Sequence, residues 1–223
     1  MIKFAIRVLG NLLTLIGLSI AIFTYAPILY AEILYRVMGP YRTIPETAQV
    51  TNVEVDETET LVPEEPDSEN ILPIEAVDNN FSIIIPKIGV NAPIVKDVTT
   101  SNEISYMNAL RDGVAHAKGT SLPGEEGNIF LFAHSSLNFW QLGPYATVFN
   151  LLNKLEDDDT VTLVYDGKRY VYRVYETDVV PGWDTTPFKQ EYDESVVTLI
   201  TCDPPGTTIN RRVIKARLIY QES

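Results

Sequence analysis

The sequence predicts an all-β domain over residues 80–223, a barrel or a sandwich of seven or eight short strands. Short runs rich in Val, Ile and aromatic residues recur there between Gly, Pro and Asp clusters, as is typical of such folds. The pair Asp166-Gly167, between two of these runs, is a strong signal for a tight β-hairpin. Helical periodicity in this domain is limited to two short stretches. The expected strands are 81–85, 90–95, 113–120, 128–133, 160–165, 168–180, 196–201 and 211–220, and the expected short helices are 101–111 and 147–155.

An apolar segment precedes the domain. From Val8 to Ala31 no charged side chain occurs over 24 residues, and a helix of that length exceeds the roughly 30 Å hydrocarbon core of a bilayer. A cleaved signal peptide is the alternative, but its apolar part usually spans only about 7–15 residues, and Pro27 follows the one small-residue cleavage candidate, Ala26. We therefore expect a transmembrane anchor over 8–31. Basic residues are balanced on its two sides, so the shortness of the head, 1–7, rather than charge favours placing that head in the cytoplasm.

Residues 32–79 are expected to form an acidic, disordered linker. Eleven carboxylates and no Lys or Arg lie between Glu46 and Asp78, without an apolar period that could build a core. The net charge of −13 over 223 residues is therefore mostly local, since the remainder carries about −2 (17 basic against 19 acidic side chains). No basic face remains that would favour binding to nucleic acid.

Cys202 is the only cysteine in the chain. A single thiol excludes an intramolecular disulfide and any multi-cysteine metal site, and leaves either a buried small hydrophobe or a reactive group. Its neighbours favour the reactive group. Cys202 ends one predicted strand, Arg211 begins the next, and His134 ends a third. A thiol, an imidazole and a guanidinium are the minimum set for covalent acyl transfer: a nucleophile, a proton carrier and a cation for developing negative charge.

The segment around the cysteine resembles that of the sortases, the membrane-anchored cysteine transpeptidases of bacterial surfaces. Leu199-Ile200-Thr201-Cys202 is similar to their Leu-x-Thr-Cys signature, and the likeness covers about Phe81 to Tyr220. Further similar stretches run from the cysteine to the arginine and ahead of the histidine: Cys202-Asp203-Pro204-Pro205-Gly206-Thr207-Thr208, Asn210-Arg211-Arg212-Val213-Ile214, Gly113-Val114-Ala115-His116, Gly119-Thr120 and Leu122-Pro123-Gly124.

This resemblance implies a sortase-like closed β-barrel that cuts a Leu-Pro-x-Thr-Gly-like sorting signal between Thr and Gly. The acyl group would then pass to an amine on peptidoglycan or on a pilin. By position, Cys202 would be the nucleophile, His134 the acid and base, and Arg211 the clamp for the oxyanion. The chemistry of these groups agrees with these roles. A nearby cation favours the thiolate form of a cysteine, and guanidinium offers forked N–H donors at any relevant pH. Histidine can give and take protons near neutral pH.

Arg212 is an alternative candidate to Arg211 for the role of oxyanion clamp. Side chains alternate along a strand, so Arg212 shares a face with Ile214 and Ala216, which looks like core, whereas Arg211 shares one with Val213. The alternation therefore favours Arg211. By the same parity Ile200 lies on the Cys202 face and, with Val213, is expected to floor a pocket for a Leu-Pro pair. Thr201 is also expected to contact substrate.

Other conspicuous residues receive structural interpretations. We expect His116 to be a structural or exposed side chain beside a turn. For Trp183 there are two interpretations: its side chain caps the groove, or it packs into the domain, and the second is favoured. Asp203 could cap the turn that follows it or act on the thiolate. Asp157-Asp158-Asp159 is more typical of a solvated turn than of a calcium site. No metal and no cofactor are expected.

The expected location is the cell membrane, with a single pass, lipid contact through the anchor and the catalytic domain outside. Expected partners are secreted proteins with the sorting signal and an amine acceptor. No Asp-Pro-aromatic lid precedes the barrel and no second apolar span follows it, which favours an anchoring role over pilus assembly but leaves the subclass open. Two alternatives stay open: a cysteine endopeptidase without transfer, and a non-catalytic, membrane-tethered β-domain.

Overall fold

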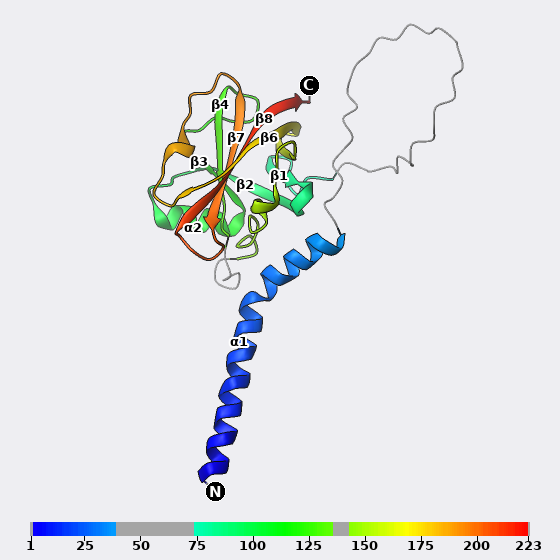
Figure 1. The fold of residues 1–223 in the computed structure, drawn as a ribbon. Coiled ribbons are helices and arrows are strands. Elements are labelled where there is room, and N and C mark those ends of the chain that lie inside the picture. Colours follow the sequence, from blue (N-terminus) through cyan, green and yellow to red (C-terminus); the bar gives the residue numbers. More distant parts are fainter. Residues whose placement is uncertain (1, 39–73, 136–142, 223) are drawn as a thin grey trace, which may run out of the picture.

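A computed structural model describes residues 2–38, 74–135 and 143–222 of the chain. In that part, a long helix is followed by an eight-stranded closed barrel (Figure 1). The helices and strands are α1 (Ile2–Met38), β1 (Phe81–Ile85), β2 (Val90–Val98), α2 (Glu103–Asp112), β3 (Val114–Ala117), β4 (Gly127–Phe132), β5 (Thr160–Tyr165), β6 (Lys168–Pro181), β7 (Ser195–Asp203) and β8 (Asn210–Gln221). Three short 3₁₀ helices are η1 (Pro86–Ile88), η2 (Leu152–Lys154) and η3 (Thr186–Phe188).

The strands close in the order β1-β2-β3-β4-β7-β8-β6-β5, with β5 paired to β1. The pairs β2–β3 and β4–β7 are parallel and the other six are antiparallel. This confirms the prediction of a barrel built from seven or eight strands. The predicted hairpin is also present: Asp166 and Gly167 connect β5 to β6 and both have positive φ, +48° and +78°, as a two-residue hairpin turn requires.

The barrel interior is filled by side chains from alternate positions of each strand. Val197 and Leu199 of β7 and Ile214 and Ala216 of β8 are fully buried there. Because side chains alternate, Ile200 and Cys202 of β7 must face the outside of the barrel. A second, smaller apolar cluster covers that outer face and consists of Ala117, Phe130, Ile200 and Val213, with Phe132 and Val180 packed against it.

The second predicted helix, 147–155, is not an α-helix. Its backbone forms successive i to i+3 hydrogen bonds, among them Asn150 N to Thr147 O and Leu155 N to Leu152 O, and η2 is its only regular part. Phe149, Leu152 and Leu155 lie three residues apart and are buried in the core. A three-residue spacing puts side chains on one face of a 3₁₀ turn, so core packing selects that geometry over an α-helix.

Helix α1 forms over the predicted anchor and continues to Met38, beyond the predicted end at residue 31. The expected transmembrane helix is nevertheless not found: among the described residues, no helix has both the length and the apolar character needed to cross a bilayer. Near its end, Glu32 Oε1 accepts a hydrogen bond from Lys154 Nζ of the barrel at 3.1 Å. Of the predicted linker, residues 39–73 lie outside the described residues.

Candidate active site

The hydrogen-bond register of β7 and β8 places Cys202 directly opposite Arg211. Directly opposed residues on antiparallel strands have Cβ atoms about 4.5–5.5 Å apart and project to the same side. Both side chains are partly buried on the outer face of the barrel. The thiol and the guanidinium predicted from the sequence are therefore brought together.

His134 reaches the same place from β4, which runs parallel to β7. Phe132 is paired with Ile200, and the next residue continues the alignment, because Ala133 N donates to Ile200 O at 3.3 Å. The hydroxyl of Thr201 donates to Ala133 O at 2.8 Å. His134, two residues past Phe132, is thus level with Cys202, two residues past Ile200.

All three side chains line one open cleft of about 530 Å³. Its wall is largely apolar and comes from three elements: Tyr106, Met107 and Leu110 of α2, Phe130 and Phe132 of β4, and Phe188 of η3. The rings of Phe188 and Phe130 stack with their centroids 3.8 Å apart. The cleft can therefore hold an extended peptide segment with apolar side chains beside a thiol, an imidazole and a guanidinium.

The loop between β7 and β8 is bonded both to the histidine segment and to Arg211, the second residue of β8. Gly206 N donates to Ser135 O at 2.7 Å, which links the loop to the residue after His134. Nη1 of Arg211 donates to Asn210 O at the start of β8, at 3.0 Å, and to Thr208 O in the loop, at 3.3 Å. Guanidinium has five N–H donors, so Nε and Nη2 carry three more that these two contacts do not use.

Arg212 forms an ion pair with Asp203. Its Nη2 donates to Asp203 Oδ2 at 2.8 Å, and both side chains are only 21% exposed. Arg212 lies on the inward-facing side of β8 with Ile214, as strand parity predicts, and it is not among the residues that line the cleft. Asp203, for which the sequence left a turn cap and an effect on the thiolate open, is an ion-pair partner.

Burial controls the protonation of His134. Desolvation lowers its pKa below the usual 6.5, because the charged imidazolium loses hydration in the wall of the cleft. Its Nε2 is buried and has no hydrogen-bond partner among the described residues. The imidazole is therefore mostly neutral at pH 7, and its Nε2 is not bound to any described residue.

Of the three residues predicted to bind substrate, two line the cleft and one lies beneath its floor. Ile200 and Thr201 line the cleft. Val213 is 2% exposed and packs against Ile200 in the small outer cluster, so it supports the floor from below. The hydroxyl of Thr201 already donates its hydrogen bond to Ala133 O. Sequence reasoning missed the contribution of α2, although the i, i+4 spacing of Tyr106 and Leu110 in that helix was a signal for one apolar face.

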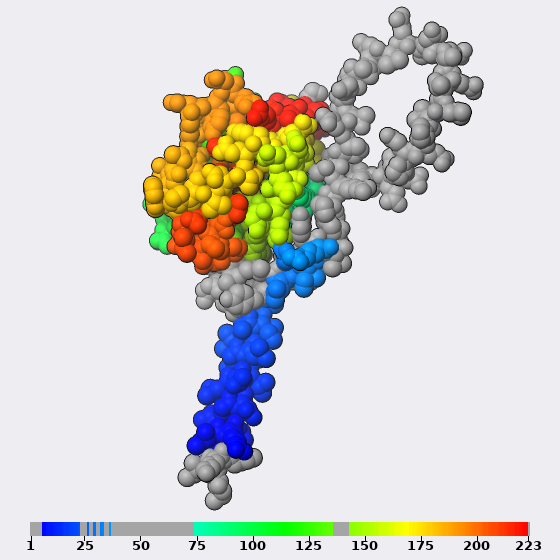
Figure 2. Space-filling model, viewed as in Figure 1, coloured from blue at the N-terminus to red at the C-terminus, as the bar shows by residue number. Residues whose placement is uncertain are grey.

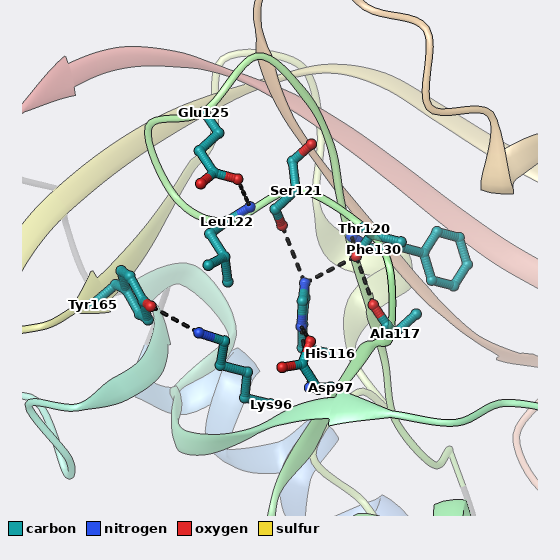
Figure 3. Close-up of polar contacts among 10 residues, drawn as sticks. All are labelled: Lys96, Asp97, His116, Ala117, Thr120, Ser121, Leu122, Glu125, Phe130 and Tyr165. Carbon is teal, nitrogen blue, oxygen red and sulfur yellow. Dashed lines mark hydrogen bonds and ion pairs between the residues drawn. The ribbon is translucent and has the colours of Figure 1, made fainter.

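His116 of β3 lies outside the cleft and is fully buried against β2 and the loop after β3 (Figure 3). Asp97 N donates to its Nδ1 at 3.4 Å, so Nδ1 is unprotonated, and Nε2 donates to Ser121 O at 3.1 Å. Thr120 Oγ1 lies 2.9 Å from the same Nε2. These contacts confirm the structural interpretation of His116.

The remaining conspicuous residues also lie away from the cleft. Trp183 is 82% exposed, so the expectation that it packs into the domain is wrong; it lies two residues beyond the end of β6. In the acidic run 157–159, Asp159 Oδ2 accepts a hydrogen bond from Lys87 Nζ at 2.8 Å, and Glu156 accepts from the same amine at 2.9 Å. Lys87 thus ties Asp159 of this run and the neighbouring Glu156 into one ion-pair cluster.

A family model described as the sortase domain matches residues 83–219. Sortase D of Bacillus subtilis is 28% identical over 120 residues, which is 54% of this chain and 52% of the relative. The chain thus spans about half the length of the curated relative that it matches.

Solved structures show the same similarity. A Clostridium perfringens structure described as a sortase D5 transpeptidase is 28% identical, with a TM-score of 0.52 over 66% of this chain and 83% of that one. Sortase C-1 of Actinomyces oris is 29% identical, with a TM-score of 0.54 over 65% and 76% of the two chains.

Proposed function

This chain belongs to the sortase family, and we propose that it is a cysteine transpeptidase that cleaves a Leu-Pro-x-Thr-Gly-like sorting signal and transfers the acyl part to an amine. The single observation that carries this proposal is the meeting of Cys202, His134 and Arg211 in one cleft. His134 follows a strand 68 residues before Cys202, Arg211 begins the strand after it, and the three strands β4, β7 and β8 are neighbours in the barrel.

In the first half-reaction the sulfur of Cys202 attacks the carbonyl carbon of the Thr–Gly peptide bond. Neutral His134 takes the thiol proton as the carbon–sulfur bond forms. The Nε–H and the Nη2–H on the same edge of the Arg211 guanidinium, which its two carbonyl contacts do not use, stabilise the negative oxygen of the tetrahedral intermediate. His134 then gives the proton to the departing glycine nitrogen, the carbon–nitrogen bond breaks, and a thioester on Cys202 remains.

In the second half-reaction an amine attacks the thioester. His134 takes one proton from the attacking nitrogen, the carbon–sulfur bond breaks, and the proton returns to the Cys202 thiolate. The lowered pKa of His134 supports this assignment, because a neutral imidazole is the form that can accept a proton. The result is a new amide and regenerated thiol.

The cleft chemistry supports a signal whose leading residues are apolar. The wall built from α2, β4 and η3 presents mostly aromatic and aliphatic side chains over about 530 Å³, which suits a Leu-Pro pair better than charged residues. We propose that Ile200, on the same strand face as Cys202, contacts this pair. The proposed partners are secreted proteins with such a signal and an amine on peptidoglycan or a pilin. The proposed place of action is the outer face of the cell membrane, where both would be found.

Product analysis tests the proposal directly. The full chain is incubated with a peptide that contains Leu-Pro-x-Thr-Gly, with and without triglycine, and the products are identified by mass spectrometry. We expect a conjugate of the Thr-ended fragment with triglycine, and none with Cys202→Ala. Release of the free acid in equal amounts with or without triglycine would show an endopeptidase. No cleavage, combined with slow alkylation of Cys202 relative to the denatured chain, would show a non-catalytic domain.

A further inference from the structure

Gly182, the residue after β6, lies against the loop between β7 and β8. Its backbone N donates to Ile209 O at 2.9 Å. In Figure 2 the gold surface that follows β6 adjoins the orange-red surface of this loop. A Cβ atom at Gly182 would lie 2.5 Å from Thr208 O and 3.0 Å from Ile209 O. Carbon and oxygen atoms in contact do not approach to 2.5 Å, so only a residue without a side chain permits this packing.

The carbonyl that Gly182 approaches is one of the two that hold the arginine. Thr208 O accepts the hydrogen bond from Arg211 Nη1 at 3.3 Å, and the same Cβ position would lie 3.4 Å from Nη1 itself. Any side chain at position 182 must therefore displace the Thr208 carbonyl, crowd the guanidinium, or both.

The constraint at Gly182 is one of space and not of backbone conformation. Gly182 is absent from the described glycines that have positive φ, so alanine can adopt its backbone angles. The residue is only partly buried and follows a strand end. A methyl group there disturbs the rim of the cleft and leaves the barrel core, on the other face of β7 and β8, unchanged.

We propose that Gly182 is a positioning residue for Arg211: its missing side chain lets the Thr208 carbonyl hold the guanidinium opposite Cys202. This inference rests on the proposed function, in which Arg211 stabilises the oxyanion. Relief of the clash requires the distance between the Cβ at position 182 and Thr208 O to increase by about 0.5 Å or more. Displacements approaching 1 Å at a catalytic group can reduce rates by about 10²-fold, so a loss of about tenfold is expected here.

The test is Gly182→Ala in the full chain, measured by transfer of the sorting-signal peptide to triglycine. We expect kcat to fall about tenfold while KM and the melting temperature stay near the wild-type values. Gly17→Ala is the matched control, because a Cβ there meets no atom within 4 Å, and it should retain full activity. Unchanged kcat in Gly182→Ala would overturn the proposal.

A double-mutant cycle separates positioning from a general structural effect. In an Arg211→Lys background the ammonium cannot make the same paired contacts, so Gly182→Ala should reduce kcat by much less than tenfold. An equal reduction in both backgrounds would show that Gly182 does not act through Arg211.

A structural readout keeps this inference separate from the proposed function. In a crystal structure of Gly182→Ala we expect the Thr208 carbonyl to be displaced and its hydrogen bond with Arg211 Nη1 to be lost; retention of that bond would overturn the positioning role. If the wild-type chain transfers no peptide, or if Arg211→Lys is too slow to measure, this readout decides the positioning role. Absence of transfer by the wild type would count against the proposed function alone.

Discussion

Cys202 of β7 and Arg211 of β8 are direct cross-strand partners, and both face outward from the barrel. A one-residue slip in the register would bring Arg212 opposite the cysteine and turn Arg211 away. The register is held by the buried inner face, where Leu199 pairs with Ile214. Core packing on one side of the two strands thus determines which arginine accompanies the thiol on the other side.

Substitution of the two neighbouring arginines should separate activity from stability. Arg211→Ala should lower kcat by about 10²- to 10³-fold, as loss of an oxyanion donor does, with little effect on the melting temperature. Arg212→Ala leaves Asp203 without its partner in a partly buried site and should lower the free energy of unfolding by about 1–3 kcal/mol. Steady-state kinetics and urea denaturation measure the two effects. The reverse pattern, with Arg211→Ala active and Arg212→Ala stable, would contradict the assignment.

Two buried threonines of β7 offer a matched comparison. The Thr201 hydroxyl donates to Ala133 O beside His134, whereas the Thr198 hydroxyl is buried with no hydrogen-bond partner among the described residues. Thr201→Val should cost about 1–3 kcal/mol of stability and also lower kcat, because it frees the segment that carries His134. Thr198→Val removes an unsatisfied hydroxyl and should be neutral or stabilising. Equal losses of stability in the two variants, measured by urea denaturation, would argue against this role of the Thr201 hydrogen bond.

Stability should fall as the pH drops below about 6.5. Burial lowers the pKa of both histidines from the usual 6.5, so the unfolded chain binds more protons than the native state below that pH. Each histidine can then reduce the free energy of unfolding by at most about 1.4 kcal/mol per pH unit until its native pKa is reached. Around His116, the carboxylates of Asp97 and Glu125 oppose the lowering and Lys96 supports it. Denaturation of the wild type at pH 7.5 and 5.5 measures the effect.

His116→Gln serves as the comparison for this pH dependence. Gln cannot titrate, so the variant should lose less stability than the wild type between pH 7.5 and 5.5, even if it is less stable at both. If the wild type were as stable at pH 5.5 as at pH 7.5, or more stable, that result would contradict the inferred direction of the pKa shifts.

Much of the barrel could be predicted from residue pattern. The runs 81–85 and 160–165 coincide with β1 and β5, because β-branched and aromatic runs bounded by turn residues favour strands strongly. Strand parity separated Arg211 from Arg212, because alternation is a local property of any strand. The meeting of three strand ends was expected from the resemblance to a family, since no local pattern shows which strands pair.

Other features depend on contacts that the sequence does not display. The 3₁₀ turns near Phe149 result from packing against the barrel, and a pattern of threes and fours does not distinguish them from an α-helix. Thr201 adjoins Cys202 in the sequence and was expected to contact substrate, yet its hydroxyl holds the histidine segment. The close approach at Gly182 is visible only once the loop between β7 and β8 lies over it.

Intact-mass spectrometry of the full chain, quenched in acid during turnover of a peptide that contains Leu-Pro-x-Thr-Gly, tests the proposed thioester on Cys202 most directly. We expect a covalent adduct on Cys202 whose mass equals the Thr-ended fragment less one water. Triglycine should remove it, and it should be absent in Cys202→Ala. Turnover without such an adduct, or an adduct that persists in Cys202→Ala, would contradict the thioester mechanism.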